Sequence, residues 1–162
     1  MVFFDTSIVI AHYLPERYSG LVEAQYSANP QPTISSYVEL EVMFVLSRLI
    51  RTNELKLALR HRRVELSLSD AQQIAALFAK HLAEDLYQSV PLSAGVYRLA
   101  RDYIARFDLP LKAPDALHLA VAATERLPLV TADRQLARNA EALGLTAELL
   151  ESSAGPLPAA TG

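Results

Sequence analysis

The stretch LKAPDALHLAVAATERLPLVTAD, residues 111–133, decides the fold of this chain. Its apolar run at 116–123 opens on a Pro-Asp pair ending at Asp115, which is typical of the first turn of a helix. A second apolar run, at 129–130, is short enough to be a buried strand, and Asp133 follows it where another helical pattern begins. This order of helix, strand, acid and helix predicts an α/β fold.

The N-terminus has the same form, because the apolar residues at 2–4 are followed by Asp5 and then by a new apolar run. In open α/β sheets the carboxyl ends of parallel strands border the crevice in which ligands bind. Acids placed repeatedly at such ends point into one crevice. We therefore expect Asp5, Asp115 and Asp133 to meet there.

Short apolar runs alternate with helical patterns along the chain. The predicted strands are 2–4, 31–34, 89–92, 129–130 and 146–150. The predicted helices are 6–14, 17–28, 38–50, 54–63, 70–86, 96–107, 116–123 and 134–143, and the segment 64–68 fits either a strand or a connector. This alternation predicts a Rossmann-like parallel sheet flanked by helices on both faces. We expect one domain over residues 1–150 and a disordered Pro/Gly-rich tail over 151–162.

Two of these helices also carry local predictions. Asp70 is placed to be the N-cap of the helix at 70–86. In the helix at 96–107, which Ser93 caps, helical spacing predicts a buried face that consists of Tyr97, Ala100, Ile104 and Phe107.

The composition narrows the possible functions. The chain has 162 residues and no Cys, so disulfides, thiolate catalysis and Cys-ligated zinc are excluded. Its net charge of −3 argues against a general nucleic-acid binder. The hydrophobic fraction of 51% is high and favours a surface covered by a protein partner. Asp5 interrupts the apolar N-terminus and no basic segment precedes it, so we expect no signal peptide, no membrane anchor and a cytoplasmic location.

Each acid taken alone is explained by helix capping, because carboxylates accept hydrogen bonds from the free N–H groups at a helix start. Together with a fourth acid, the set predicts more. That acid lies early in the helix after Ser36, and it is either Glu39, which falls within the apolar arc of the helix, or Glu41, which lies at its boundary. The helical wheel does not choose between them.

Four carboxylates in one crevice would repel one another, and at least one would keep its proton well above its ordinary pKa. A hard divalent cation removes this repulsion, and Mg²⁺ and Mn²⁺ prefer oxygen ligands. Such a site suits phosphodiester hydrolysis, because bound metal lowers the pKa of a water and stabilises the attacking and leaving oxygens.

At these residues the chain resembles the PIN-domain ribonucleases, and more narrowly the VapC-type toxins of toxin–antitoxin pairs. The matching pieces occur in family order and are FFDTSIVI (3–10), TISSYVELEV (33–42), LKAPDALHLAVAA (111–123) and LVTADRQLARNAEALGL (129–145). They span nearly the whole chain, although the segment 60–69 matches no motif of the family. Each piece is weak alone, and the ordered set is the specific signal.

Carried over residue by residue, the resemblance implies a PIN-like fold and a catalytic metal site built from Asp5, Glu41, Asp115 and Asp133. It also implies that Ser7 and Thr131 donate hydrogen bonds to a ligand or carboxylate nearby. The family further implies dependence on Mg²⁺ or Mn²⁺, an RNA substrate, a homodimer, and inhibition by a cognate VapB-like antitoxin that also binds DNA.

Basic residues near the expected crevice are candidates to hold a phosphate of the substrate. These are Lys112 and Arg134, with Arg138 a weaker candidate, and an ion-paired or solvated side chain is the alternative for each. His118 lies one helical turn after Asp115, and we expect it to be packed or hydrogen-bonded, because Mg²⁺ avoids imidazole.

Two other functions compete with a nuclease. A phospho-accepting receiver module needs an acid pair after its first strand and a Lys after its last, and this sequence has neither. The second alternative is a protein that keeps the fold and binds partners without catalysing a reaction. All four candidate acids are present, so nothing in the sequence supports a loss of activity. Binding of Mn²⁺ would separate this alternative from an active nuclease.

Overall fold

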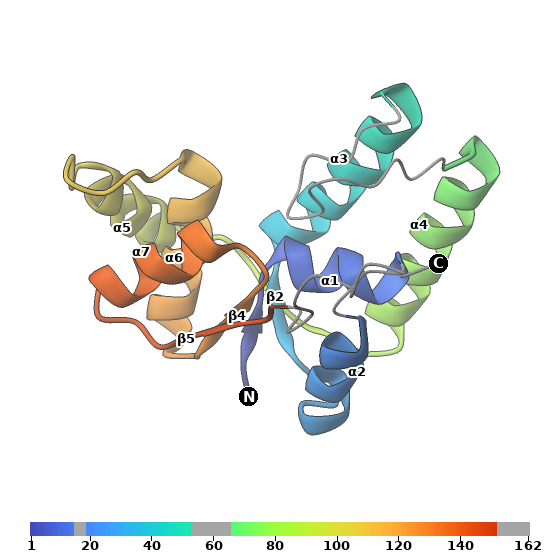
Figure 1. Ribbon diagram of the computed structural model, residues 1–162, viewed down its shortest axis with the longest axis horizontal. Coiled ribbons are helices and arrows are strands. Elements are labelled where there is room, and N and C mark those ends of the chain that lie inside the picture. Colours follow the sequence, from blue (N-terminus) through green and yellow to red (C-terminus); the bar gives the residue numbers. More distant parts are fainter. Residues whose placement is uncertain (15–18, 53–65, 152–162) are drawn as a thin grey trace, which may run out of the picture.

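The computed structural model describes residues 1–14, 19–52 and 66–151 and has a five-stranded parallel sheet in that part of the chain (Figure 1). The strands are β1 (Phe3–Phe4), β2 (Thr33–Ser35), β3 (Gln88–Val90), β4 (Leu129–Thr131) and β5 (Ala147–Leu149). Their order across the sheet is β3-β2-β1-β4-β5, and every pairing is parallel.

Seven helices connect the strands within the described residues. They are α1 (Thr6–Tyr13), α2 (Ser19–Ala28), α3 (Ser36–Thr52), α4 (Leu68–Ala83), α5 (Ala94–Ile104), α6 (Ala113–Glu125) and α7 (Arg134–Ala142). Figure 1 shows α1 to α4 on one side of the strands and α5 to α7 on the other. The predicted fold, a parallel sheet with helices on both faces, is therefore confirmed.

The strand order places a switch point in the middle of the sheet. From β1 the chain runs outward through β2 to β3, then crosses back to β4 and continues to β5 at the opposite edge. The connection that follows β1 therefore leads toward β2, whereas the connection that follows β4 leads in the opposite direction, toward β5. Ligands of open α/β sheets bind at such a point, outside the carboxyl ends of the strands. Here β1 leads directly into Asp5, and β4 ends at Thr131.

The core lies around the same pair of strands. Phe3, Phe4, Leu129 and Val130 have no exposed surface, as expected for short strands covered on both faces. A fully buried apolar centre thus holds the two chain segments that carry Asp5 and Asp133.

Two local predictions were wrong. The N-cap of α4 is Ser67, while Asp70 sits three residues later and accepts a hydrogen bond from the Ser67 backbone N–H, which makes a capping box. In α5 the buried residues are Val96 and Ala100, whereas the other three members of the predicted face are exposed: Tyr97, Ile104 and Phe107. The packing of α5 against α6 selects a stripe rotated by about one residue, and Phe107 lies beyond the end of the helix.

Several predictions lie outside the described residues. They are the helix at 54–63, most of the unmatched segment 60–69, and all but the first residue of the tail at 151–162. No helix within 1–14, 19–52 and 66–151 combines the length and the apolar character that crossing a membrane requires.

Candidate metal centre

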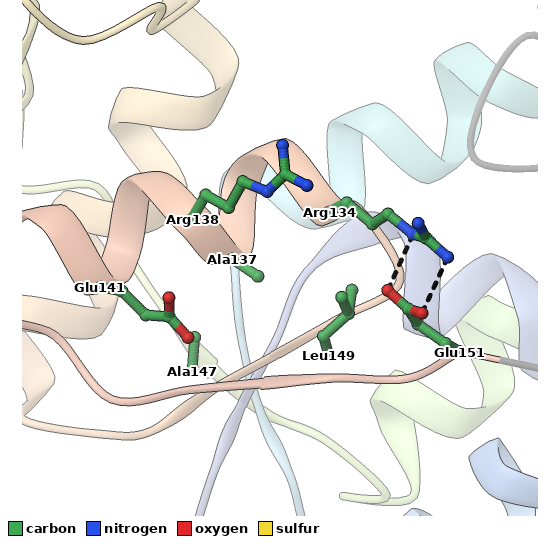
Figure 2. Close-up of a pocket in the computed structure, with 7 residues that line it drawn as sticks. All are labelled: Arg134, Ala137, Arg138, Glu141, Ala147, Leu149 and Glu151. Atoms are coloured by element: carbon green, nitrogen blue, oxygen red, sulfur yellow. Dashed lines mark hydrogen bonds and ion pairs between the residues drawn. The ribbon is translucent and has the colours of Figure 1, made fainter.

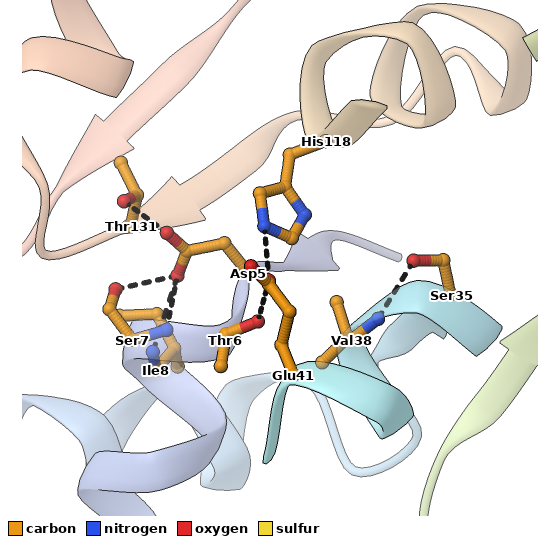
Figure 3. A network of polar contacts seen from close by, with 9 residues as sticks. All are labelled: Asp5, Thr6, Ser7, Ile8, Ser35, Val38, Glu41, His118 and Thr131. Atoms are coloured by element: carbon orange, nitrogen blue, oxygen red, sulfur yellow. Dashed lines mark hydrogen bonds and ion pairs between the residues drawn. The ribbon is translucent and has the colours of Figure 1, made fainter. Parts of the chain in front are cut away.

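Asp5 occupies the junction of β1 and α1 and is almost fully buried. Its Oδ1 accepts hydrogen bonds from the backbone N–H groups of Ser7 and Ile8, at 3.1 and 3.2 Å, and from the Ser7 hydroxyl at 2.6 Å (Figure 3). Asp5 is thus the N-cap of α1, as the capping explanation predicts. Capping uses only one of its two carboxylate oxygens.

The second oxygen of Asp5 links the ends of β1 and β4. Its Oδ2 accepts a hydrogen bond of 2.6 Å from the hydroxyl of Thr131, which is fully buried. The Thr131 oxygen in turn accepts the backbone N–H of Asp133 at 2.9 Å, and the Ser7 hydroxyl accepts the N–H of Ala132 at 2.9 Å. Ser7 and Thr131 therefore hold the Asp5 carboxylate against the start of α7.

Glu41 reaches the same place from α3. Its Oε2 accepts hydrogen bonds from the Thr6 hydroxyl at 2.5 Å and from His118 Nε2 at 2.8 Å. Because a carboxylate can only accept, His118 must carry its proton on Nε2. Glu39 lies elsewhere, and its carboxylate accepts a hydrogen bond from Ser89 of β3. Of the two acids that the helical wheel left open, Glu41 is the one beside the Asp5 segment.

The remaining two acids approach from α6 and α7. Asp115 is half-buried in the first turn of α6, and it interacts electrostatically with both Asp133 and His118. Asp133 is exposed and caps α7, where its Oδ1 accepts the N–H groups of Gln135 and Leu136 at 2.7 and 3.1 Å. Hydrogen bonds and electrostatic contacts therefore connect all four predicted acids into one cluster.

Burial sets the charge balance of this cluster. Loss of hydration raises the pKa of Asp5, and the His118 charge and the hydrogen bonds to Asp5 only partly offset it. Burial and the neighbouring Asp133 likewise raise the pKa of Asp115. For Glu41, burial would also raise the pKa, but the hydrogen bonds from His118 and Thr6 outweigh it and lower the value. Two of the four acids thus resist ionisation mainly because they are buried, and repulsion between carboxylates contributes only at Asp115, through Asp133.

His118 supplies positive charge to the cluster. Its side chain is buried, which lowers its pKa, but the hydrogen bond to Glu41 and the charges of Glu41, Asp5 and Asp115 together raise the pKa above its ordinary value. The prediction that His118 is packed and hydrogen-bonded is confirmed. Its Nδ1 has no hydrogen-bond partner among the described residues.

The donor chemistry of the cluster fits a hard divalent cation, since its ligands would be carboxylate oxygens whose ionisation a cation favours. The side chains as they are placed do not form a site for a cation. Within the described part of the chain, no three His, Asp or Glu side chains are grouped so as to hold an ion. Asp5 and Glu41 are turned instead toward Ser7, Thr131, Thr6 and His118.

The basic candidates have different neighbours. Lys112 is exposed at the N-cap of α6, and its backbone N–H and its charge lower the pKa of Asp115. Arg134 is paired with Glu151. Two partners of Glu41, namely Thr6 and Tyr37, were not predicted from the sequence. Thr6 follows the first acid directly, which is a signal that could have found it, whereas nothing in the sequence marks Tyr37.

The family model described as the PIN domain matches residues 2–142. No curated protein sequence matches the chain.

Several solved structures share its fold. A sarcin–ricin loop-cleaving toxin, VapC20 of Mycobacterium tuberculosis, is 17% identical with a TM-score of 0.64, and the match covers 90% of this chain and 97% of that one. VapBC2 of Rickettsia felis, bound to a DNA fragment from its promoter, is 19% identical with a TM-score of 0.60, covering 93% and 100%. A toxin–antitoxin complex from Klebsiella pneumoniae is 22% identical with a TM-score of 0.54, covering 82% and 87%.

Proposed function

The chain belongs to the PIN domain family, and from this premise we propose that it is a metal-dependent endoribonuclease and the toxin of a VapBC-type toxin–antitoxin pair. The observation that carries the proposal is the convergence of Asp5, Glu41 and Asp115 on His118, beside the switch point of the sheet. The similar structures include one RNA-cleaving toxin and two toxin–antitoxin assemblies, which supports the same assignment. Membership in this family leaves the receiver-like alternative without support.

We assign the metal to Asp5, Glu41, Asp115 and Asp133, and the ion to Mg²⁺ or Mn²⁺. When bound, such an ion stabilises charge on a phosphodiester and lowers the pKa of a water. Ser7 and Thr131 keep Asp5 in place by their hydrogen bonds to its two oxygens. Lys112 and Arg134, exposed beside Asp115 and Asp133, are assigned to the phosphates of the RNA.

A second candidate function follows from the placement of the acids. Since no three of them are grouped for an ion in the described residues, a PIN-fold protein that binds partners without turnover also agrees with the structure. The nuclease proposal requires Glu41 or Asp5 to exchange a present hydrogen bond for the ion. Metal-dependent cleavage of RNA separates the two functions.

Glu41→Gln is expected to lower Mn²⁺-dependent RNA cleavage about 10²-fold or more, because a metal ligand supplies several kcal/mol of transition-state stabilisation and each 1.36 kcal/mol is tenfold in rate. Glu39→Gln is the matched control on the same helix, and its rate should equal that of the parent, since Glu39 faces Ser89. The measurement is the initial rate on a labelled RNA with EDTA, with Mg²⁺ and with Mn²⁺. Equal rates for both variants would refute the assignment of Glu41, and a parent that is inactive with either metal would favour the binding-only function.

We also propose a homodimer and a VapB-like antitoxin as protein partners. Three neighbouring apolar side chains on α3 are exposed and support a protein contact: Leu40, Met43 and Phe44. We expect light scattering on purified protein to give twice the chain mass of 17.8 kDa. We expect co-expression with the product of a small adjacent gene to yield a complex that no longer cleaves RNA. A monomer at all concentrations would contradict the homodimer. Full RNA cleavage by the complex would contradict the antitoxin.

A further inference from the structure

A groove lies between α7 and the edge strand β5, outside the carboxylate cluster (Figure 2). It encloses about 140 Å³, and its inner wall consists of the small or apolar side chains of Ala137, Ala147 and Leu149. Small residues keep the space open at this position. The remaining lining residues are two basic and two acidic side chains, namely Arg134, Arg138, Glu141 and Glu151.

Two guanidinium groups extend from α7 along this groove. Arg134 and Arg138 are one helical turn apart and point to the same side of the helix (Figure 2). Like charges at this spacing repel each other and destabilise a helix. Arg138 is exposed and has no hydrogen bond or ion pair among the described residues. An anion bound between the two guanidinium groups relieves this repulsion, against the opposing charge of Glu141 further along α7.

Arg134 already holds an anionic group. Its Nε and Nη2 each lie 2.8 Å from a different carboxylate oxygen of Glu151, which follows β5. This two-point geometry is the one by which a guanidinium binds a carboxylate or a phosphate. Both side chains remain partly exposed, at 68% for Arg134 and 39% for Glu151, so the pair is weak enough to be exchanged.

One end of the groove lies next to the candidate metal centre in the sequence, through Arg134. Arg134 is the residue directly after Asp133, and from there α7 carries Arg138 away from the cluster by about 6 Å, four residues at 1.5 Å each. When one phosphodiester of an RNA strand lies at the carboxylates, the neighbouring phosphates of the strand also lie close to the cluster. The acids of the cluster repel these neighbouring phosphates. The two Arg side chains supply positive charge at that border.

We propose that this groove is a subsite for a backbone phosphate of single-stranded RNA, held by Arg134 and Arg138, and that the phosphate displaces Glu151 from Arg134. The inference rests on the proposed nuclease function. An acidic protein segment would satisfy the same guanidinium groups, but the position of Arg134 directly after Asp133 favours RNA. Phosphate contacts position a strand without reading its bases, so the subsite acts on any sequence.

Arg138→Gln is expected to weaken the binding of a short fluorescein-labelled RNA roughly fivefold, and to make its dependence on salt shallower by about 0.7 in the log–log slope, the value for one phosphate contact in a single strand. Glu151→Gln should tighten binding roughly threefold, because it frees Arg134. The measurement is fluorescence anisotropy in EDTA over a range of salt concentrations. Arg126→Gln is the matched control, since Arg126 ends α6 at the opposite end of β4 from Thr131.

Two results would overturn the inference. Equal RNA affinities for the parent and Arg138→Gln would do so, as would weaker binding by Glu151→Gln. If Arg138→Gln also binds a labelled oligoglutamate peptide more weakly than the parent while its RNA affinity is unchanged, the groove is assigned to a protein ligand. Cleavage by the parent with Mn²⁺ is measured separately. An inactive parent with the expected RNA affinities refutes the nuclease proposal alone, and an active parent with unchanged affinities refutes the subsite alone.

Discussion

Asp115→Asn is expected to abolish RNA cleavage without loss of stability. The substitution removes one negative charge and leaves an amide oxygen that still accepts the Lys112 N–H, so the start of α6 keeps its hydrogen bond. The expected fall in the cleavage rate is about 10²-fold or more, as for any residue that supplies several kcal/mol through a metal ion.

The sign of the stability change follows from the raised pKa of Asp115. Burial and the neighbouring Asp133 disfavour its charged form in the folded protein, so at neutral pH the ionised carboxylate costs stability that a neutral amide does not. We therefore expect a melting temperature equal to that of the parent or higher. A carboxyl group whose pKa is raised by burial and by a neighbouring acid is typical of a functional site.

Asp102→Asn is the matched control for this experiment. Asp102 is an exposed carboxylate on α5, paired with Arg101 at 2.9 Å, and its replacement should change neither the cleavage rate nor the melting temperature by more than about 3 °C. Melting followed by circular dichroism and initial cleavage rates with Mn²⁺ are the two measurements. Cleavage by Asp115→Asn at the parental rate would remove Asp115 from the catalytic site.

The sequence predicted the segments that carry the site because each has a strong local signal. Short apolar runs before Asp5 and Asp133 marked β1 and β4, and the Pro-Asp pair marked the start of α6. The adjacency of these segments is not local. It depends on the strand order β3-β2-β1-β4-β5, which places β4 beside β1 although about 125 residues separate them.

The choice between Glu39 and Glu41 could not be made from the helical wheel for a related reason. Both lie in the first turns of α3, and their partners come from distant parts of the chain. Ser89 of β3 meets Glu39, whereas Thr6 and His118 meet Glu41. In α5, likewise, the buried stripe is chosen by the packing of α5 against α6, and the spacing of apolar residues alone gave the wrong face.

Asp5 allows its structural and its proposed catalytic contributions to be separated by two substitutions. Asp5→Ala removes the N-cap of α1 and leaves the hydroxyls of Ser7 and Thr131 without their buried acceptor. Loss of a cap costs about 1 kcal/mol and an unsatisfied buried group about 1–3 kcal/mol. We expect the free energy of unfolding to fall by about 2–4 kcal/mol, which lowers the melting temperature on the order of 10 °C.

Asp5→Asn keeps the cap, since Asn is as good an N-cap as Asp. Its amide oxygen can accept the Ser7 and Ile8 N–H groups, and its NH₂ can donate to Thr131, whose hydroxyl rotates to suit. The substitution also replaces a buried carboxyl group, whose pKa is raised by burial, with a neutral amide. The unfolding free energy should therefore change by less than about 1 kcal/mol, while Mn²⁺-dependent cleavage should be lost as in Asp5→Ala.

Urea unfolding and cleavage assays on the same preparations give both quantities for the parent and the two variants. If Asp5→Asn cleaves RNA as fast as the parent, Asp5 is only a helix cap and the proposed metal site loses its most buried member. If both variants are equally unstable, the negative charge itself holds β1 to β4 through Thr131, and loss of cleavage in either variant would not identify a ligand. Only a stable, inactive Asp5→Asn assigns the carboxylate to chemistry, because it alters the charge and leaves the cap in place.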